Sequence, residues 1–165
     1  VKGLSSPPQF APCRVEEVVG LVVKTLRVLA EGKRIALRTE GLDTLPPILA
    51  DENRLFNAFY NLVNNAIPEV PAGGSITIRG RARPDARVVL LEVADTGRGM
   101  SPEVRARLFT ARAISSKAGG TGLGTKIVKD VVDAHGGQIT VDSEEGRGTT
   151  FHILLPFHPP GCYAR

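Results

Sequence analysis

Hydrophobic residues near the start of the chain are spaced as in an amphipathic helix. Between Arg14 and Ala30 they recur every three or four positions, at Val15, Val18, Val19, Val22, Val23, Leu26 and Leu29. This period predicts a helix with one buried face. From Arg34 to Glu40 apolar and polar residues alternate instead, which predicts a half-buried strand.

A second amphipathic pattern follows a short extended segment at 45–50. Asp51 precedes this pattern, and aspartate at such a position is a favourable N-cap. The apolar positions of the pattern are Leu55, Phe59, Leu62 and Ala66. We expect the helix to end at Pro68, because proline interrupts the helical hydrogen bonds.

The second half of the chain predicts two hairpins and a helix between them. The four segments with strand-like alternation are 75–83, 87–94, 138–143 and 149–156. The helix is predicted from Gly124 to His135, because two glycines follow it as a stop signal. The whole pattern predicts an α+β fold, a two-layer α/β sandwich with helices on one face of a mixed, mostly antiparallel sheet.

Composition narrows the possible classes of protein. A chain of 165 residues that is 42% hydrophobic can bury one core, so one domain is expected. The net charge is +4, but the basic residues are scattered along the chain and aromatic residues make up only 5%. Both observations argue against nucleic acid as a partner. Cys13 and Cys162 lack metal-ligand spacing and fit a reducing compartment. No apolar run is long enough to span a membrane, so we expect a cytoplasmic domain that meets a membrane only through a parent protein.

Two asparagines on the second helix are candidate metal ligands. Asn61 and Asn65 are four residues apart and therefore lie on one helical face. Their side-chain carbonyl oxygens suit Mg²⁺, which prefers oxygen ligands. The alternative is that both are ordinary solvated helix residues.

The segment Asp95-Thr-Gly-Arg-Gly-Met100 is a candidate base-binding loop. A carboxylate at the end of a buried strand can accept a hydrogen bond from the exocyclic amine of adenine, whereas the carbonyl of guanine would be repelled. Gly97 and Gly99 would let the backbone approach a ligand closely. The alternative is a simple turn that ends the strand.

A glycine cluster at 119–124 leads into the apolar helix and is a candidate phosphate site. The N–H groups at a helix N-terminus and the helix dipole both favour anions. The residues after Gly124 match neither a Walker A loop nor a dinucleotide fingerprint. Lys117 precedes the cluster and could reach a terminal phosphate. The three histidines have no neighbours of ligand type and are expected to be structural.

These segments, with Leu108-Phe109, resemble in their order the N, G1, F and G2 boxes of the sensor histidine kinase catalytic and ATP-binding domain. That domain belongs to the superfamily of gyrase B and MutL and has the Bergerat-type ATP-binding fold. The resemblance extends over residues 10–157 and includes Gly146-Arg-Gly-Thr-Thr-Phe151 near the end. It implies a linker from a missing helical dimerisation domain at 1–13, the ATP-binding domain at 14–157 and a tail at 158–165.

The resemblance also implies roles for individual residues. Asn65 would coordinate Mg²⁺, and Asn61 would contact phosphate or a water on the metal. Asp95 would bind the adenine amine with help from Gly97 and Gly99. The remaining base contacts would come from Met100, which lines the pocket, and Thr150, which lies beneath the adenine.

The phosphates would be held by a lid that gains order when a γ-phosphate is bound. The lid is expected at residues 110–120. The residues that would hold the β- and γ-phosphates are Lys117, Gly120, Thr121, Gly122, Leu123 and Gly124. Thr125-Lys126 stands where the family usually has an apolar pair.

The function implied is that of a protein-histidine kinase in two-component signal transduction. The domain would bind ATP and Mg²⁺ and present the γ-phosphoryl group to a histidine on the dimerisation domain, with a response regulator as the downstream partner. Gyrase-like ATPases and anti-sigma serine kinases have a glutamate base where this chain has Asn61. A stand-alone ATPase or anti-sigma-type serine kinase is therefore the main alternative, and a non-catalytic partner-binding module is the second.

Overall fold

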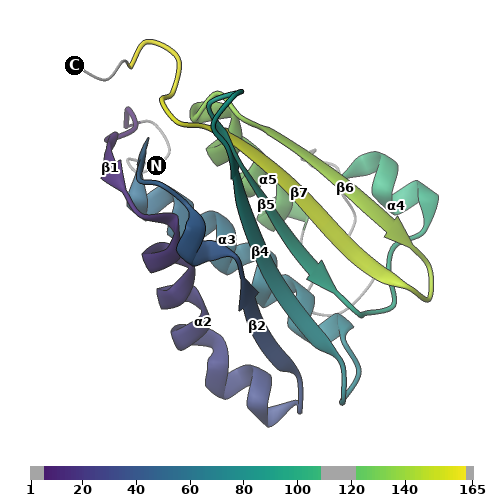
Figure 1. The fold of residues 1–165 in the computed structure, drawn as a ribbon. Coiled ribbons are helices and arrows are strands. Elements are labelled where there is room, and N and C mark those ends of the chain that lie inside the picture. The colour runs from purple at the N-terminus through teal and green to yellow at the C-terminus, as the bar shows by residue number, and fades with distance from the viewer. Residues whose placement is uncertain (1–5, 109–121, 163–165) are drawn as a thin grey trace.

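A five-stranded sheet with helices packed on one face forms the framework of the molecule (Figure 1). This computed structural model describes residues 6–108 and 122–162. The strands are β2 (Ala36–Glu40), β4 (Ser75–Arg83), β5 (Val88–Asp95), β6 (Gln138–Glu144) and β7 (Gly148–Pro156). Their order is β2-β4-β5-β7-β6, and only β2 and β4 run parallel. The predicted mixed, mostly antiparallel sheet and both hairpins are confirmed.

Three long helices cover the sheet: α2 (Val15–Gly32), α3 (Glu52–Ala66) and α5 (Gly122–Ala134). Figure 1 views the sheet with α3 and α5 behind the strands. Short helices are α4 (Pro102–Arg107), η1 (Leu42–Thr44) and η2 (Ile67–Glu69). The buried apolar residues that the strands contribute to the core are Leu37, Ile76, Ile78, Val89, Leu91, Val93, Ile153 and Leu155. Helices therefore lie on one face, as predicted.

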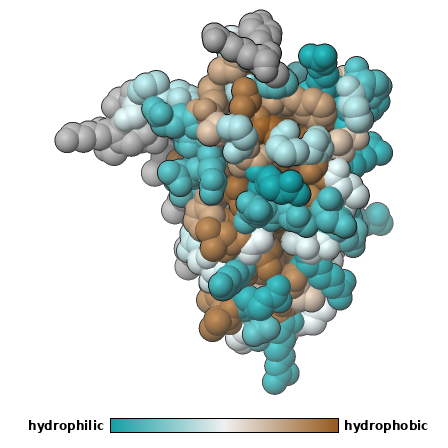
Figure 2. All heavy atoms as spheres, turned by 60° about the vertical axis from the view of Figure 1, so that its left-hand side comes forward, coloured by the Kyte–Doolittle hydropathy of each residue, from teal (hydrophilic) through white to brown (hydrophobic). Residues whose placement is uncertain are grey.

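The two amphipathic helices follow their sequence patterns closely. Asp51 caps α3 as expected, and its side chain accepts a hydrogen bond from the Arg54 backbone N–H. On α2 the predicted stripe is correct except at its last member. Leu29 is 50% exposed, and Ala30 takes the buried position in the last turn. Figure 2 brings the α2 side forward, where hydrophobic residues lie scattered among hydrophilic ones.

The last residues of the segment predicted as a linker, 1–13, form a short strand. Ala11–Cys13 form β1, which pairs antiparallel with β3 (Ile48–Ala50). The Gln9 backbone N–H donates to the Asp51 carboxylate at 2.9 Å, and the Arg54 guanidinium donates to the Ser6 carbonyl. Burial raises the pKa of the Cys13 thiol to about 11, helped by nearby carboxylates. This thiol is therefore unreactive at neutral pH.

A buried histidine joins this segment to two helices. His135 follows α5 directly and is 1% exposed. Its Nε2 accepts the Asp51 backbone N–H at 3.0 Å, and its Nδ1 lies 2.8 Å from the Val131 carbonyl. A carbonyl only accepts, so Nδ1 carries the proton and the ring is neutral. The Phe10 ring packs edge-on against it, with 5.2 Å between centroids. One imidazole thus connects the end of α5, the start of α3 and the N-terminal segment.

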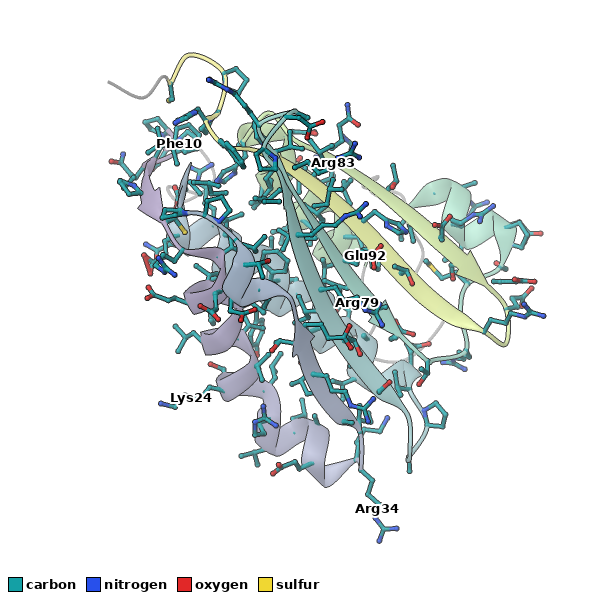
Figure 3. The ribbon with its side chains drawn as sticks, viewed as in Figure 1. Phe10, Lys24, Arg34, Arg79, Arg83 and Glu92 are labelled. Carbon is teal, nitrogen blue, oxygen red and sulfur yellow. The ribbon has the colours of Figure 1, made fainter. Side chains whose placement is uncertain are left out.

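Charged side chains cross the uncovered face of the sheet in a row. Arg79 contacts Glu40 at 2.8 Å and Glu92 at 3.6 Å, and Figure 3 shows Arg79 and Glu92 side by side. His152 contacts Glu92 at 3.3 Å through Nδ1 and Asp142 at 2.9 Å through Nε2. These five residues come from all five strands in spatial order, and we call them the charge ladder.

Stability should depend on pH through His135. Its pKa is lowered from the ordinary value of 6.5, mainly because burial disfavours the charged ring. The unfolded chain therefore takes up a proton first as the pH falls. The stabilisation is complete above pH 6.5 and is lost as the pH falls toward the lower folded-state pKa, by at most about 1.4 kcal/mol per pH unit for one proton. Urea unfolding between neutral and mildly acidic pH would measure this loss.

The control variants separate titration from packing. His135→Gln keeps an acceptor for the Asp51 N–H but does not titrate, so its pH dependence should be shallower than that of the wild type. His135→Phe leaves that buried N–H without an acceptor and should cost about 1–3 kcal/mol at pH 7. An unchanged pH dependence in His135→Gln would contradict the assignment.

Candidate nucleotide-binding site

The carboxylate of Asp95 is held in one orientation at the end of β5. Its Oδ1 accepts the backbone N–H of Gly97 at 2.8 Å and that of Thr149 at 3.3 Å. Asp95 is half-buried and opposes Thr149 on β7. Hydrogen bonds from two backbone groups fix a carboxylate more firmly than side-chain contacts can, because the backbone has no rotamer freedom here.

Residues 95–100, which we call the 95–100 loop, approach neighbouring backbone very closely. Gly99 has a φ of +72°, and a Cβ on it would lie 2.1 Å from the Glu144 carbonyl oxygen. A Cβ on Gly97 would lie 2.7 Å from the Glu69 carbonyl oxygen. Side chains are therefore excluded at both positions. The sequence predicts a close approach of this backbone to a ligand, and the close approaches in this structure are to the β6–β7 hairpin and to η2.

Further contacts tie the 95–100 loop to the end of α3. The Arg98 backbone N–H donates to the Glu69 carbonyl at 3.2 Å, and the Arg98 Nε pairs with Glu69 Oε1 at 2.7 Å. Glu69 ends η2, which follows α3 directly. The loop and the asparagine-bearing helix are thus fixed to each other through one residue that sequence analysis did not single out.

The threonine that faces Asp95 is Thr149, and its neighbour on β7 is Thr150, the residue predicted to lie beneath the adenine. Thr149 is buried and pairs with Asp95, whereas Thr150 pairs with Ala94. Successive residues of a strand point to opposite faces, so Thr150 lies on the face away from Asp95.

Asn61 and Asn65 lie in the last two turns of α3, as predicted, and both are half-buried. The Asn61 amide nitrogen donates to the Asn57 carbonyl at 2.7 Å. The side-chain oxygen of Asn61 therefore remains as the acceptor that can meet a ligand. Its partner Asn65 is one turn further along the same face.

The phosphate-binding part of the prediction lies mostly outside the described residues. Lys117, Gly120, Thr121, Phe109 and the expected lid at 110–120 fall there. The helix after the glycines starts at Gly122 instead of Gly124, so two glycines belong to the first turn of α5. Thr125 is buried, and Lys126 pairs with Asp130 at 2.6 Å. This helix therefore accommodates the unusual Thr-Lys pair without disruption.

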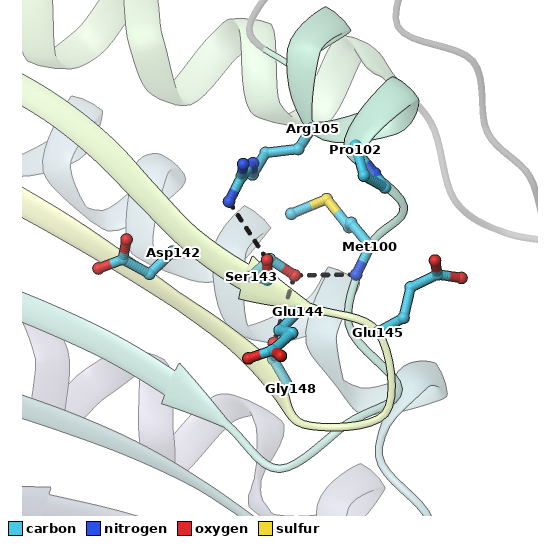
Figure 4. Close-up of a pocket in the computed structure, with 8 residues that line it drawn as sticks. All are labelled: Met100, Pro102, Arg105, Asp142, Ser143, Glu144, Glu145 and Gly148. Carbon is cyan, nitrogen blue, oxygen red and sulfur yellow. Dashed lines mark hydrogen bonds between the residues drawn. The ribbon is translucent and has the colours of Figure 1, made fainter.

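A cavity of about 570 Å³ lies beside the 95–100 loop, between α4 and the β6–β7 hairpin (Figure 4). The described residues that line it are Met100, Pro102, Arg105, Asp142, Ser143, Glu144, Glu145 and Gly148. Among the predicted site residues that the structure describes, Met100 lines it. The cavity therefore adjoins the predicted base site at Met100.

The donor set fits magnesium held together with phosphates. Among residues 6–108 and 122–162 no group of three or more His, Cys, Asp or Glu side chains could hold a metal ion. A metal at α3 would take amide oxygens from Asn61 and Asn65, with phosphate and water completing its shell, as Mg²⁺ does at nucleotide sites.

In the part of the chain that the structure describes, no helix has the length and apolar character needed to cross a bilayer.

Comparison with known proteins agrees with this geometry. Residues 50–159 match the family described as histidine kinase-, DNA gyrase B- and HSP90-like ATPase. Sporulation kinase E of Bacillus subtilis (strain 168) is 34% identical over 142 residues, which cover 86% of this chain and 19% of that protein. The chain spans between 19% and 38% of the length of the curated relatives compared.

The fold of this chain is also similar to solved structures of histidine kinases. Full-length ShkA in complex with AMPPNP superimposes with a TM-score of 0.82 at 33% identity, covering 98% of this chain and 33% of that chain. The catalytic domain of the histidine kinase ThkA superimposes with a TM-score of 0.79 at 26% identity, covering 92% and 97%. The chain therefore belongs to the histidine kinase-, DNA gyrase B- and HSP90-like ATPase family, and its resemblance to the sensor histidine kinase catalytic domain is confirmed.

Proposed function

We propose that this chain is the ATP-binding catalytic domain of a sensor histidine kinase. It binds Mg-ATP and presents the γ-phosphoryl group to a histidine on a separate helical dimerisation domain. The observation that carries the proposal is the Asp95 carboxylate, held by the backbone N–H groups of Gly97 and Thr149 at the end of β5. Its orientation supports a role in reading the edge of a base.

Asp95 selects adenine by hydrogen-bond polarity. A fixed carboxylate accepts a hydrogen bond from the exocyclic amine of adenine and repels the carbonyl that guanine has at that position. Thr149 takes the supporting role that sequence analysis gave to Thr150, because it is buried beside Asp95. Gly97 and Gly99 let the loop that carries Asp95 pack closely on Glu69 and Glu144, and Met100 would line the edge of the ring.

The other end of the nucleotide is assigned to α3 and α5. Asn65 would bind the metal and Asn61 a phosphate or metal-bound water, through side-chain oxygens. Lys117 and the backbone from Gly120 to Gly124 would hold the terminal phosphates. Bound Mg-ATP supplies the transferable phosphoryl group and the charge that neutralises it, so the chain contributes mainly orientation.

The position of Asn61 favours phosphoryl transfer to histidine over hydrolysis. The amide of Asn61 donates to the Asn57 carbonyl and has no basic nitrogen that could activate water or a serine hydroxyl. An imidazole acceptor on another domain needs no such base. We therefore rank a stand-alone ATPase or anti-sigma-type serine kinase second.

The remaining partners follow from the same proposal. The dimerisation domain supplies the acceptor histidine, and a response regulator takes the phosphoryl group from it. We assign the domain to the cytoplasm, where ATP and response regulators meet. The segment 1–13 is proposed as the connection to the dimerisation domain, with its end held on the catalytic domain through β1.

Replacing Asp95 should remove adenine selectivity. In Asp95→Asn an acceptor becomes a donor at the base edge, so ATP affinity should fall about 10–100-fold, as expected for loss of a charged hydrogen bond. Calorimetry with Mg-ATP and Mg-GTP would measure both affinities. Glu92→Gln, on the same strand but the uncovered face, is the matched control and should leave both unchanged. Equal affinity of the wild type for the two nucleotides would disprove the assignment.

Binding and phosphotransfer should separate in this chain. Alone it should bind ATP, hydrolyse it slowly and acquire no stable phosphate, because no acceptor histidine belongs to it. Adding the parent's histidine-bearing helical domain should produce an acid-labile phosphohistidine on that domain, detectable with radiolabelled ATP. Asn65→Ala should slow this transfer at least about tenfold by disturbing Mg²⁺.

The control for that experiment is Asn53→Ala, an exposed asparagine in the first turn of α3. It should transfer at the wild-type rate. Rapid ATP hydrolysis by the chain alone, unaffected by Asn65→Ala, would instead favour the ATPase alternative.

A further inference from the structure

The hydroxyl of Ser143 is a point where three parts of the candidate site meet. Ser143 lies on β6 and is half-buried. Its Oγ accepts the Met100 backbone N–H at 2.8 Å and lies 3.2 Å from the Gly148 carbonyl (Figure 4). The same oxygen lies 2.8 Å from Thr149 Oγ1. The residue belongs to none of the four family motifs and was not among the predicted site residues.

Ser143 reaches both ends of the 95–100 loop. Met100, at the end of the loop, is bound directly. Asp95, at the start, is reached through Thr149, whose hydroxyl lies against Ser143 and whose backbone N–H donates to Asp95 Oδ1. The three residues Ser143, Thr149 and Asp95 are consecutive register partners across β6, β7 and β5, so they form one row on the sheet.

The backbone around Ser143 strengthens this link. Its carbonyl accepts a hydrogen bond from Arg105 Nη1 at 3.3 Å, which ties α4 to β6. The next residue, Glu144, supplies the carbonyl against which Gly99 packs. The Gly146 N–H donates to the Arg98 carbonyl at 2.7 Å. The 95–100 loop is therefore held on the β6–β7 hairpin at Asp95 and from Arg98 to Met100, and Ser143 is the hairpin side chain that binds the Met100 end.

We propose that Ser143 is a positioning residue for adenine selectivity. It holds the 95–100 loop, and with it the Asp95 carboxylate, in a fixed place on the β6–β7 hairpin. The inference rests on the proposed role of Asp95 in reading the base. A carboxylate distinguishes an amine from a carbonyl only when its place relative to the ring is fixed, because binding groups must be held closely to their productive geometry. Loss of the hydroxyl leaves the Met100 N–H without this acceptor and loosens Thr149.

The test is the ratio of ATP to GTP affinity in Ser143 variants of the full chain. Ser143→Ala should lower the affinity for Mg-ATP about tenfold while Mg-GTP changes little, so the ratio falls about tenfold. Ser143→Thr keeps the hydroxyl and should retain the wild-type ratio. Thr140→Ala removes a hydroxyl from an exposed position of the same strand and should also leave the ratio unchanged. Calorimetry gives the affinities, and thermal unfolding gives the stability of each variant.

Each outcome decides between distinct claims. No selectivity in the wild type would overturn the role of Asp95 and with it the proposed function. A selective wild type with an unchanged ratio in Ser143→Ala would overturn the role of Ser143 alone, as would an equal loss of both nucleotides alongside lower stability. Should Ser143→Ala fail to fold, Ser143→Cys replaces the hydroxyl by a poor acceptor of similar size. A reduced ratio in Ser143→Cys would support the inference, and a wild-type ratio would overturn it.

Discussion

The candidate site depends on two places where backbone segments approach each other so closely that only glycine fits. Gly99 meets the Glu144 carbonyl, and Gly148 meets the Asp95 carbonyl, each with only 2.1 Å to where a Cβ would stand. Both glycines have positive φ, so even an alanine would add strain to the clash. These contacts lock the 95–100 loop onto the β6–β7 hairpin. The backbone N–H groups of Gly97 and Thr149, which orient the Asp95 carboxylate, lie within this backbone fit.

The opposite end of the molecule is organised by one hydrogen bond to a neutral ring. The bond from the Asp51 N–H to His135 sets the start of α3 against the end of α5. These two helices carry Asn61, Asn65 and the first turn at Gly122. The helices that we propose to hold the metal and the phosphates are therefore joined at a point far from Asp95, where burial lowers the pKa of the imidazole.

Much of the fold could be predicted because local patterns determine it. The amphipathic periods of α2 and α3, the Asp51 cap and the two hairpins need no knowledge of distant contacts. The errors arise where such knowledge is needed. β1 is too short and proline-rich to show a period, and its strand character comes only from pairing with β3. On α2, Leu29 and Ala30 lie on either side of the boundary of the buried face, and only the packing decides between them.

Candidate site residues could be predicted from the sequence where they belong to a local motif. They could not be predicted where their position depends on how two strands are aligned. Asp95, Asn61 and the glycines stand in recognisable segments. The choice between Thr149 and Thr150 depends on how β7 aligns with β5, which the sequence does not state. Ser143 carries no local signal at all, since its partner Met100 lies 43 residues away. Glu69 likewise acts through a contact 29 residues distant.

The charge ladder on the uncovered sheet face determines how that surface meets its surroundings. A sheet with one bare face usually risks stacking on another sheet, which apolar side chains would promote. Here polar and charged groups cross the centre of the strands, where water can hydrate them, and each acidic side chain already contacts Arg79 or His152. An approaching protein would have to remove that hydration while gaining little net attraction. The ladder thus disfavours stacking of this face on the face of another sheet.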